Sequence, residues 1–353
     1  MISSYTVRTL RVCFFSAIAS AALASCGRAG IPSSMPLGSR PLAGAARNTG
    51  QNLIAFSPNG TPSIGVFSAA SSGRVEPSRL LQGSKTTLAW GNSAGVDSSG
   101  EIYAIVGSPL RLLQFGPHAA GNAAPEHVVD LPKKLLSGYV VGFAPDNRGN
   151  FFISDGPDSR VLRFPILKQG SAKANAAFVP VLTTPMGPLA ARPGNVSVGP
   201  HGILYVLASV VEQGNVWHGV SQYSVDAAGH AKLVRSFTDT SLPEAPPSSI
   251  AVDSSGTLYL AGGLDTNPIF AYAPAAQSGL THYSRAIGFT TNTAVSSIAT
   301  DNAGQLYVAL KGHIDVFAAD ANGLGVKPVR ALWDVQDLQY GNNAYGSLLT
   351  LTR

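Results

Sequence analysis

Five segments of the chain repeat one pattern of apolar and polar positions. Each has an apolar run, a polar turn that ends in glycine, and a second apolar or aromatic run. The turn glycines are Gly100, Gly149, Gly202, Gly256 and Gly304, at steps of 49, 53, 54 and 48 residues. Four of the turns have Asp three positions before the glycine, which suits a type I turn joining antiparallel strands. Each segment is therefore predicted to be a β-hairpin.

A second hairpin is predicted after each first one. Its leading strand ends in an aromatic residue, at Phe115, Phe164, Tyr223, Tyr272 and Phe317. A stretch rich in Gly, Ala and Pro follows, and then a last strand that often has Arg before apolar residues, as at Arg235, Arg285 and Arg330. Four strands per repeat of about 50 residues are typical of a β-propeller blade.

A sixth unit is divided between the two ends of the chain. Residues 50–56 match the strand after the turn, and 64–67 and 78–81 supply the third and fourth strands. The run 347–352 stands 50 residues after the innermost strand at Ile298. We therefore predict an all-β, six-bladed β-propeller of four-stranded antiparallel blades, closed by a C-terminal inner strand that joins three N-terminal strands. Such closure protects the strand edges.

The first 25 residues are predicted to be an export signal. Arg8 and Arg11 precede an apolar or small stretch, Val12–Ser25, that is too short to span a bilayer and leads into small residues. The sequence Leu23-Ala24-Ser25-Cys26 resembles the lipobox of bacterial lipoproteins, which implies that Cys26 becomes the acylated first residue. An ordinary signal peptide with a chance cysteine is the alternative. Gly27, rather than Asp, favours the outer membrane or cell surface in that family.

The sequence thus predicts three regions: a lipoprotein signal peptide (1–25), the lipidated cysteine with a flexible tether (26–49), and the propeller (50–353). The tether is rich in Gly, Pro, Ser and Ala, as flexible linkers are. The chain has two cysteines, and Cys13 lies in the signal. Neither a disulfide framework nor a cysteine metal site is therefore expected in the folded region.

Composition narrows the class of protein further. Of 353 residues, 45% are hydrophobic and 12% are charged, which excludes a disordered chain. The excess of 24 Lys and Arg over 19 Asp and Glu equals the five arginines within the first 50 residues. The remainder of the chain is formally neutral, so we expect no nucleic-acid partner.

One stretch resembles a known repeat family. The sequence Gly149-Asn-Phe-Phe-Ile-Ser-Asp155-Gly-Pro-Asp158-Ser-Arg160-Val-Leu-Arg-Phe164 is similar to the NHL repeat, with Asp158 in place of the usual Asn. Over 50–353 the pattern resembles the NHL-repeat and SMP-30-like group of propellers. The resemblance implies that Asp155 and Arg160 tie the loop between the second and third strands, whereas the other blades lack this pair. Propellers host many chemistries, so it implies little about function.

Signals for an enzyme are weak, and we predict no catalytic residue, no metal site and no cofactor. The motif Gly91–Gly95 fits G-x-S-x-G, but it leads into a strand instead of a helix. The seven histidines are scattered along the sequence. SMP-30-like enzymes hold an axial metal with Glu, Asn, Asp or His, and no Glu falls in a predicted inner strand. A metal-dependent periplasmic hydrolase or lyase with its site on the axis remains the alternative function.

Aromatic residues give a signal for binding. They are expected on one face of the ring, near loops that include the excursions 209–218 and 333–346, at Trp90, Trp217, His218, Trp333, Tyr340 and Tyr345. Such side chains offer stacking faces with a polar handle. The alternative is that these rings only cap the core between blades. The predicted function is an exported, lipid-anchored binding or scaffold module at the bacterial cell envelope, with a protein, peptide or carbohydrate ligand.

Overall fold

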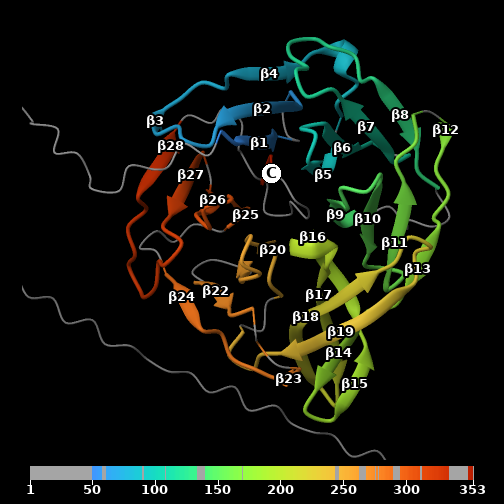
Figure 1. Ribbon diagram of the computed structural model, residues 1–353, viewed down its shortest axis with the longest axis vertical. Coiled ribbons are helices and arrows are strands. Elements are labelled where there is room, and N and C mark those ends of the chain that lie inside the picture. Colours follow the sequence, from blue (N-terminus) through green and yellow to red (C-terminus); the bar gives the residue numbers. More distant parts are fainter. Residues whose placement is uncertain are drawn as a thin grey trace, which may run out of the picture. The chain divides into compact units, whose positions relative to one another are not determined.

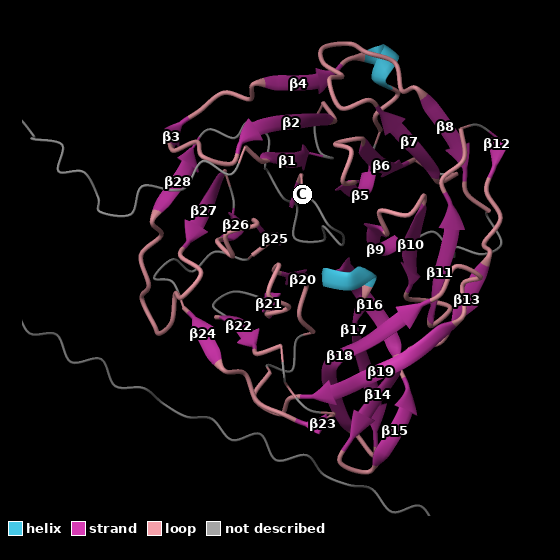
Figure 2. Cartoon of the chain, in the orientation of Figure 1, coloured by secondary structure: helices cyan, strands magenta, loops and turns pink. Residues whose placement is uncertain are grey.

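The computed structural model describes the chain from Gly50 to Thr352 with short gaps. The described residues are 50–57, 61–89, 91–107, 109–132, 140–168, 170–242, 246–261, 268–274, 276, 278–288, 295–310, 312–333 and 349–352. They belong to the second of two compact units, Ala46–Arg353. This unit is a ring of small β-sheets with two short 3₁₀ turns, Ser84–Thr86 and Pro200–Gly202 (Figures 1 and 2). No helix among these residues has the length and apolar character needed to cross a membrane.

Six blades make up the ring, each ordered from the axis outward. The innermost strands are β29 (Leu349–Leu351), β5 (Gly91–Val96), β9 (Val140–Pro145), β16 (Arg192–Val198), β20 (Ser249–Val252) and β25 (Ser297–Thr300) for blades 1 to 6. The second strands are β1 (Asn52–Ser57), β6 (Ile102–Val106), β10 (Asn150–Asp155), β17 (Leu204–Glu212), β21 (Leu258–Ala261) and β26 (Leu306–Leu310). The sequence prediction of a six-bladed propeller is therefore confirmed.

The outer strands follow the same order of blades. The third strands are β2 (Ser63–Ser68), β7 (Arg111–Phe115), β11 (Arg160–Pro165), β18 (Asn215–Val225), β22 (Ile269–Tyr272) and β27 (His313–Phe317). The fourth are β4 (Arg79–Gln82), β8 (His127–Asp130), β13 (Ala176–Phe178), β19 (Ala231–Thr238), β24 (Arg285–Ile287) and β28 (Arg330–Trp333). Three blades add a short fifth strand that was not predicted: β12 (Gly170–Ser171), β23 (Gly279–Leu280) and β3 (Gly73–Arg74).

Blade 1 closes the ring by joining the two ends of this unit. Strand β29 pairs antiparallel with β1, with Leu351 opposite Leu53 and Leu349 opposite Ala55. The backbone N–H of Asn52 donates to Thr352 Oγ1 at 2.8 Å. On the other side, the N–H of Leu349 donates to Ser297 Oγ of blade 6 at 3.2 Å. The closing strand is thus bonded to β1 of its own blade and to the neighbouring blade 6, as its position in the repeat predicts.

The Asp-to-Gly turns have the predicted chemistry. In blade 5, Asp253 Oδ1 accepts hydrogen bonds from the N–H groups of Ser255 and Thr257, both at 2.9 Å. The N–H of Gly256 donates to the Asp253 carbonyl at 3.0 Å, and Gly256 has φ of 87°. A positive φ of this size is accessible to glycine at little cost. Each carboxylate therefore caps its own hairpin.

Arginines of the fourth strands join successive blades. Their guanidinium groups donate to backbone carbonyls in the turn after the third strand of the next blade: Arg79 to Pro117 and Ala119, Arg235 to Ala276, Arg285 to Ala319 and Ala321, and Arg330 to Ala69 and Ser71. Four of the six junctions are bridged in this way by the described residues. We call these contacts the arginine bridges.

Blade 4 differs from the prediction in the excursion over 209–218. The structure shows no loop there, because β17 and β18 continue as one hairpin to its turn at Gln213 and Gly214. A hairpin formed by β14 (Val181–Thr184) and β15 (Gly187–Ala190) packs beside it. Leu182 lies in a small core with Ala208, and Thr184 Oγ1 donates to Glu212 Oε2 at 2.9 Å. Apolar packing and this hydrogen bond stabilise the extended strands outside the blade.

Removing the closing strand should destabilise the whole ring. Deletion of residues 347–353 takes away the buried Leu349 and Leu351 and exposes the edge of β1. Each lost large apolar side chain costs about 2–5 kcal/mol, against a typical stability of 5–15 kcal/mol. We expect aggregation or a sharply lowered Tm by differential scanning calorimetry. Deletion of residues 28–46 should leave the Tm nearly unchanged, and a truncated ring that melts like the full chain would contradict the closure.

A matched pair of leucines tests the same point with less disruption. Leu351 is 6% exposed in the closing strand, whereas Leu324 is 86% exposed in a turn of blade 6. Leu351→Ala should lower the free energy of unfolding by about 2–5 kcal/mol in urea titrations, because it leaves a cavity. Leu324→Ala should change it by less than about 0.5 kcal/mol. Equal effects of the two substitutions would show that β29 is not part of the packed core.

Candidate functional site

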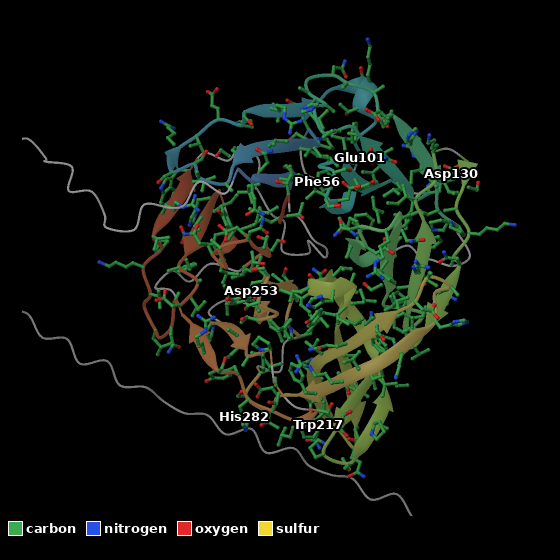
Figure 3. The ribbon with its side chains drawn as sticks, in the orientation of Figure 1. Phe56, Glu101, Asp130, Trp217, Asp253 and His282 are labelled. Atoms are coloured by element: carbon green, nitrogen blue, oxygen red, sulfur yellow. The ribbon has the colours of Figure 1, made fainter. Side chains whose placement is uncertain are left out.

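A cavity of about 270 Å³ lies on the axis of the ring, between all six innermost strands. Small residues line much of it, with one from each of five strands: Gly95, Ala144, Ser197, Ala251 and Ala299. Among the described residues that line it, Asp253 and Asp301 contribute the charged side chains, and there is no Lys or Arg. Figure 3 places Asp253 near the middle of the ring. The cavity is suited in size and charge to a small neutral or cationic ligand.

The two axial carboxylates already serve the turns. Asp301 Oδ1 accepts the N–H groups of Ala303 and Gln305 at 2.9 and 2.8 Å. Its Oδ2 accepts the hydroxyl of Tyr307 at 3.3 Å, and Asp253 Oδ2 accepts that of Tyr259 at the same distance. Within the described parts of the chain, no group of three His, Cys, Asp or Glu side chains is placed to hold a metal. These aspartates therefore act first as structural caps.

The predicted aromatic face is only partly described. Trp90, Tyr340 and Tyr345 lie outside the described residues, and so does Cys26. Trp217 is in β18 of blade 4 and Trp333 is in β28 of blade 6, with blade 5 between them. The structure thus does not bring these two indoles into one site. Figure 3 shows Trp217 toward the outer edge of the ring.

Trp217 and His218 are adjacent in sequence but face opposite sides of their sheet, because successive strand residues alternate. His218 is 4% exposed, and its Nδ1 lies 2.7 Å from Ser209 Oγ. Trp217 lies opposite Val210, which packs against the small core at Leu182. These two side chains therefore belong to the packing of the extended hairpin and do not form a joint binding surface.

Trp333 belongs to a polar aromatic cluster at the rim of blade 6, together with His313 and Asp315. Register places Trp333 directly opposite His313, and their rings stack with centroids 4.6 Å apart at 20°. His313 Nε2 lies 3.8 Å from Asp315 Oδ1. Trp333 is half exposed, whereas Asp315 is 7% exposed. We call these three residues the rim cluster.

The surroundings of Asp315 change its electrostatics. Burial raises the pKa of its carboxyl group, and the neighbouring His313 opposes that rise. A carboxyl that is costly to ionise can accept or share a proton with a ligand or with the imidazole. The half-exposed indole supplies a face for stacking, and the imidazole beside it supplies a hydrogen-bonding group. Chemically, the rim cluster is suited to binding a planar or sugar-like group.

Asp155 and Arg160 are in contact at the turn between β10 and β11. Arg160 Nε and Nη2 both lie 3.3 Å from Asp155 Oδ2, and Nη2 lies 2.5 Å from Asp158 Oδ2. Asp155 is fully buried, and the two residues are also opposite each other in the strand register. The guanidinium therefore neutralises a buried carboxylate and fixes the loop to the blade.

Sequence reasoning missed His313 and Asp315. The signal was present, because His313-Ile314-Asp315 alternates in a strand and so places both polar side chains on one face. What the sequence lacked was the register of β27 against β28, which brings Trp333 beside His313. That register depends on the length of the connection between the two strands.

Solved structures resemble this chain in fold but hardly in sequence. A protein from Lactobacillus plantarum has a TM-score of 0.51 at 14% identity, over 79% of this chain and 82% of that chain. A protein of unknown function from Bacteroides caccae has a TM-score of 0.50 at 14% identity, over 86% of this chain and 99% of that chain. No protein family model and no curated protein matches the sequence. The likeness shows the fold alone, which defines the class: a six-bladed β-propeller.

The raised pKa of Asp315 predicts a pH-dependent stability. Between the ordinary Asp pKa and the raised one, the unfolded chain binds fewer protons than the folded chain, so stability falls as pH rises. Asp315→Asn should remove this loss. We expect its Tm advantage over the wild type to grow between pH 4 and neutral pH, roughly the range above an Asp pKa of about 3.9. The exposed Asp320→Asn is the control, and a pH-independent difference for Asp315→Asn would refute the assignment.

Proposed function

We propose that this protein is an exported, lipid-anchored propeller that acts as a binding or scaffold module at the bacterial cell envelope. The observation that carries the binding role is the rim cluster, where a half-exposed indole stacks on an imidazole next to a buried carboxyl. Tryptophan is one of the residues enriched at binding hot spots. The closed ring gives them a rigid support.

The envelope location is proposed from the N-terminal sequence. Leu23-Ala24-Ser25-Cys26 resembles a lipobox, and acylation of Cys26 would anchor the chain through its lipids. Two or more acyl chains are needed for stable membrane attachment. Residues 27–49 would then form a tether with an r.m.s. reach of roughly 25–30 Å. Gly27 favours the outer membrane or surface as the destination.

The proposed ligand is a carbohydrate or a peptide bound at the rim cluster. Trp333 provides an apolar face for a sugar ring or an apolar side chain, and the imidazole of His313 beside it provides a hydrogen-bonding group. The NHL-type loop of blade 3, with Asp155, Asp158 and Arg160, supports kinship with the NHL-repeat and SMP-30-like propellers.

A metal-dependent hydrolase or lyase is the second candidate, favoured by Asp253 and Asp301 at the axial cavity. Their engagement in turn caps argues against it, because metal ligation would compete with four hydrogen bonds at Asp253 and three at Asp301. Elemental analysis of the purified chain decides between the two. A stoichiometric bound metal would favour the enzyme and overturn the assignment of these residues as caps.

The anchor is tested by Cys26→Ser. Without the thiol no thioether lipid can form, so the variant should lose the acyl mass and leave the membrane fraction, or accumulate as uncleaved precursor. Mass spectrometry of the N-terminal peptide and fractionation of cells measure both. If the wild-type chain carries no lipid and is freely soluble after export, the anchor proposal is wrong.

The ligand face is tested by Trp333→Ala. Because Trp333 is half exposed, its loss should hardly change the Tm. Binding of the ligand found on oligosaccharide and peptide arrays should weaken by at least about tenfold, as for a central aromatic hot spot. Trp217→Ala is the matched control on another blade and should preserve the affinity. The reverse ranking of the two variants would move the site to the extended hairpin.

A further inference from the structure

The outer edges of the blades are covered in a regular way. A fourth strand presents unpaired N–H and C=O groups that can template another strand. On five of the six blades, the connection between the third and fourth strands of the next blade covers this edge, always in the parallel direction. The pairs are β28 with β3, β8 with β12, β19 with β23, and the single bridges of Leu81 with Gly121 and of Ile287 with Gly323.

Each covering segment uses a glycine with positive φ at the point of pairing. The glycines are Gly73, Gly121, Gly170, Gly279 and Gly323, with φ of 83°, 61°, 95°, 98° and 107°. In blade 5, for example, Gly323 N–H donates to the Ala286 carbonyl at 2.8 Å, and Gly288 N–H donates to the Gly323 carbonyl at 2.9 Å. The same pairing therefore recurs on five blades: the outer edge of the fourth strand pairs with a parallel segment that has a positive-φ glycine at the point of contact.

Blade 3 is the exception. The Ala177 carbonyl and the Val179 N–H of blade 3 correspond in the repeat to the Ala286 carbonyl and the Gly288 N–H of blade 5. Neither of these two groups of blade 3 has a partner among the described residues. Gly229 of blade 4 stands at the repeat position of the covering glycines. The residues after it, however, pair with their own blade, where Ala231 lies opposite Val225 and Leu233 opposite Tyr223. The segment of blade 4 that would be expected to pair with β13 therefore pairs within its own blade instead.

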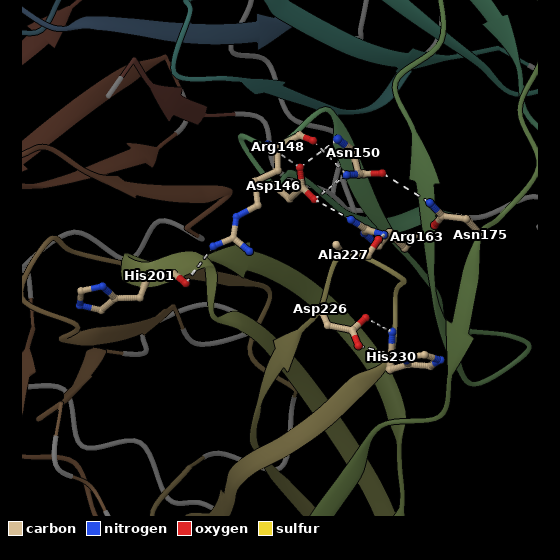
Figure 4. A network of polar contacts seen from close by, with 9 residues as sticks. All are labelled: Asp146, Arg148, Asn150, Arg163, Asn175, His201, Asp226, Ala227 and His230. Atoms are coloured by element: carbon tan, nitrogen blue, oxygen red, sulfur yellow. Dashed lines mark hydrogen bonds and ion pairs between the residues drawn. The ribbon is translucent and has the colours of Figure 1, made fainter.

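The sequence of β13 also departs from most other blades at this junction. Ala176 occupies the position that carries the bridging arginine in four other blades. Arg163 of β11 reaches across instead, with Nη1 3.3 Å from the Ala227 carbonyl and Nη2 3.4 Å from Asp146 Oδ2 (Figure 4). A cavity of about 190 Å³ remains at this junction. A β-carbon added to Gly229 would lie 2.7 Å from that of Ala176, so the turn abuts the start of β13 and leaves its end open.

The open edge has the character of a pairing site. The residues Ala176–Val179 carry no charge, Ala177 is exposed and Val179 is 48% exposed. The ring of Phe178 packs against that of Tyr223 in blade 4, tilted by 50° with centroids 4.7 Å apart, which helps to hold the strand in place. Uncharged strand edges with free backbone groups bind extended peptides by β-augmentation.

We propose that the edge of β13 is a docking site for an extended segment of a partner protein, which adds as a fifth, parallel strand. The segment would place a glycine with positive φ opposite Phe178, where it accepts from Val179 N–H and donates to the Ala177 carbonyl. Small or apolar uncharged residues would flank this glycine. The site lies on the circumference of blade 3, and it depends neither on the rim cluster nor on the lipid anchor.

A peptide copied from this chain tests the site. Residues 278–283 (Ser-Gly-Leu-Thr-His-Tyr) cover β19 through Gly279, so an acetylated, amidated copy with photo-leucine in place of leucine is the probe. It is photolysed at millimolar concentration with the full chain in detergent, and the adducts are mapped by mass spectrometry. We expect crosslinks within residues 175–180. Val179→Pro removes the N–H donor and should reduce the yield about fivefold, the effect of one backbone hydrogen bond.

Two controls keep the outcome decisive. Val179→Ala retains the N–H and should crosslink like the wild type. A peptide with Val in place of Gly should lose crosslinking to the unaltered chain, a result that does not depend on how a variant folds. Crosslinks elsewhere, or equal yields with the two peptides, would overturn the proposal. So would a dimer of the full chain that Val179→Pro dissociates, because the edge would then be occupied by a second copy.

Discussion

The pairing of β29 with β1 is the constraint on which the rest of this structure depends. A row of blades becomes a ring only when its last sheet bonds to its first, and here three residues at the C-terminal end complete a sheet begun at Asn52. The Arg330 bridge to the Ala69 carbonyl reinforces the same junction from the outside. Burial raises the pKa of Tyr307 to about 12, so its hydroxyl keeps its proton and donates to that carbonyl at 2.8 Å. The ring is thus closed on the inside by the pairing of β29 with β1 and on the outside by the contacts of Arg330 and Tyr307 with Ala69.

Closure also explains where binding surfaces can form. The axis is lined by small residues whose polar neighbours are used to cap turns, as Asp253 and Asp301 show. The residues of the outer strands, at the rim and circumference of the ring, vary more from blade to blade than those at the axis. There the chain places Trp333 against His313, and it departs from the common pattern at Ala176. Positions that break the repeat are therefore the best candidates for function in this propeller.

Much of the fold was predictable because its signals are local. The Asp-to-Gly turns, the aromatic residue at the end of each third strand and the arginine of the fourth strand recur at nearly constant spacing. The position of the closing strand followed from the same spacing. The partner of each arginine was not predictable, because it is a backbone carbonyl of the next blade and carries no sequence signal.

The candidate sites were predicted less well, for the same physical reason. Trp333 was identified by its residue type, but its stacking on His313 depends on strand register. The loop expected at 209–218 is a hairpin because a second hairpin, β14–β15, supports it, and nothing in the sequence of 209–218 indicates that support. The uncovered edge of β13 follows from where the blade 4 connection folds, which is a contact between segments about 50 residues apart.

Native-state hydrogen exchange would test the closed ring most directly. The amide hydrogens that join β29 to β1 should exchange only when the whole ring unfolds, with the same free energy as the amides between β10 and β11 in blade 3. Their exchange should also respond to denaturant with the same slope as global unfolding. Exchange of the β29 amides at a much lower free energy, with little dependence on denaturant, would contradict a ring held closed by this strand.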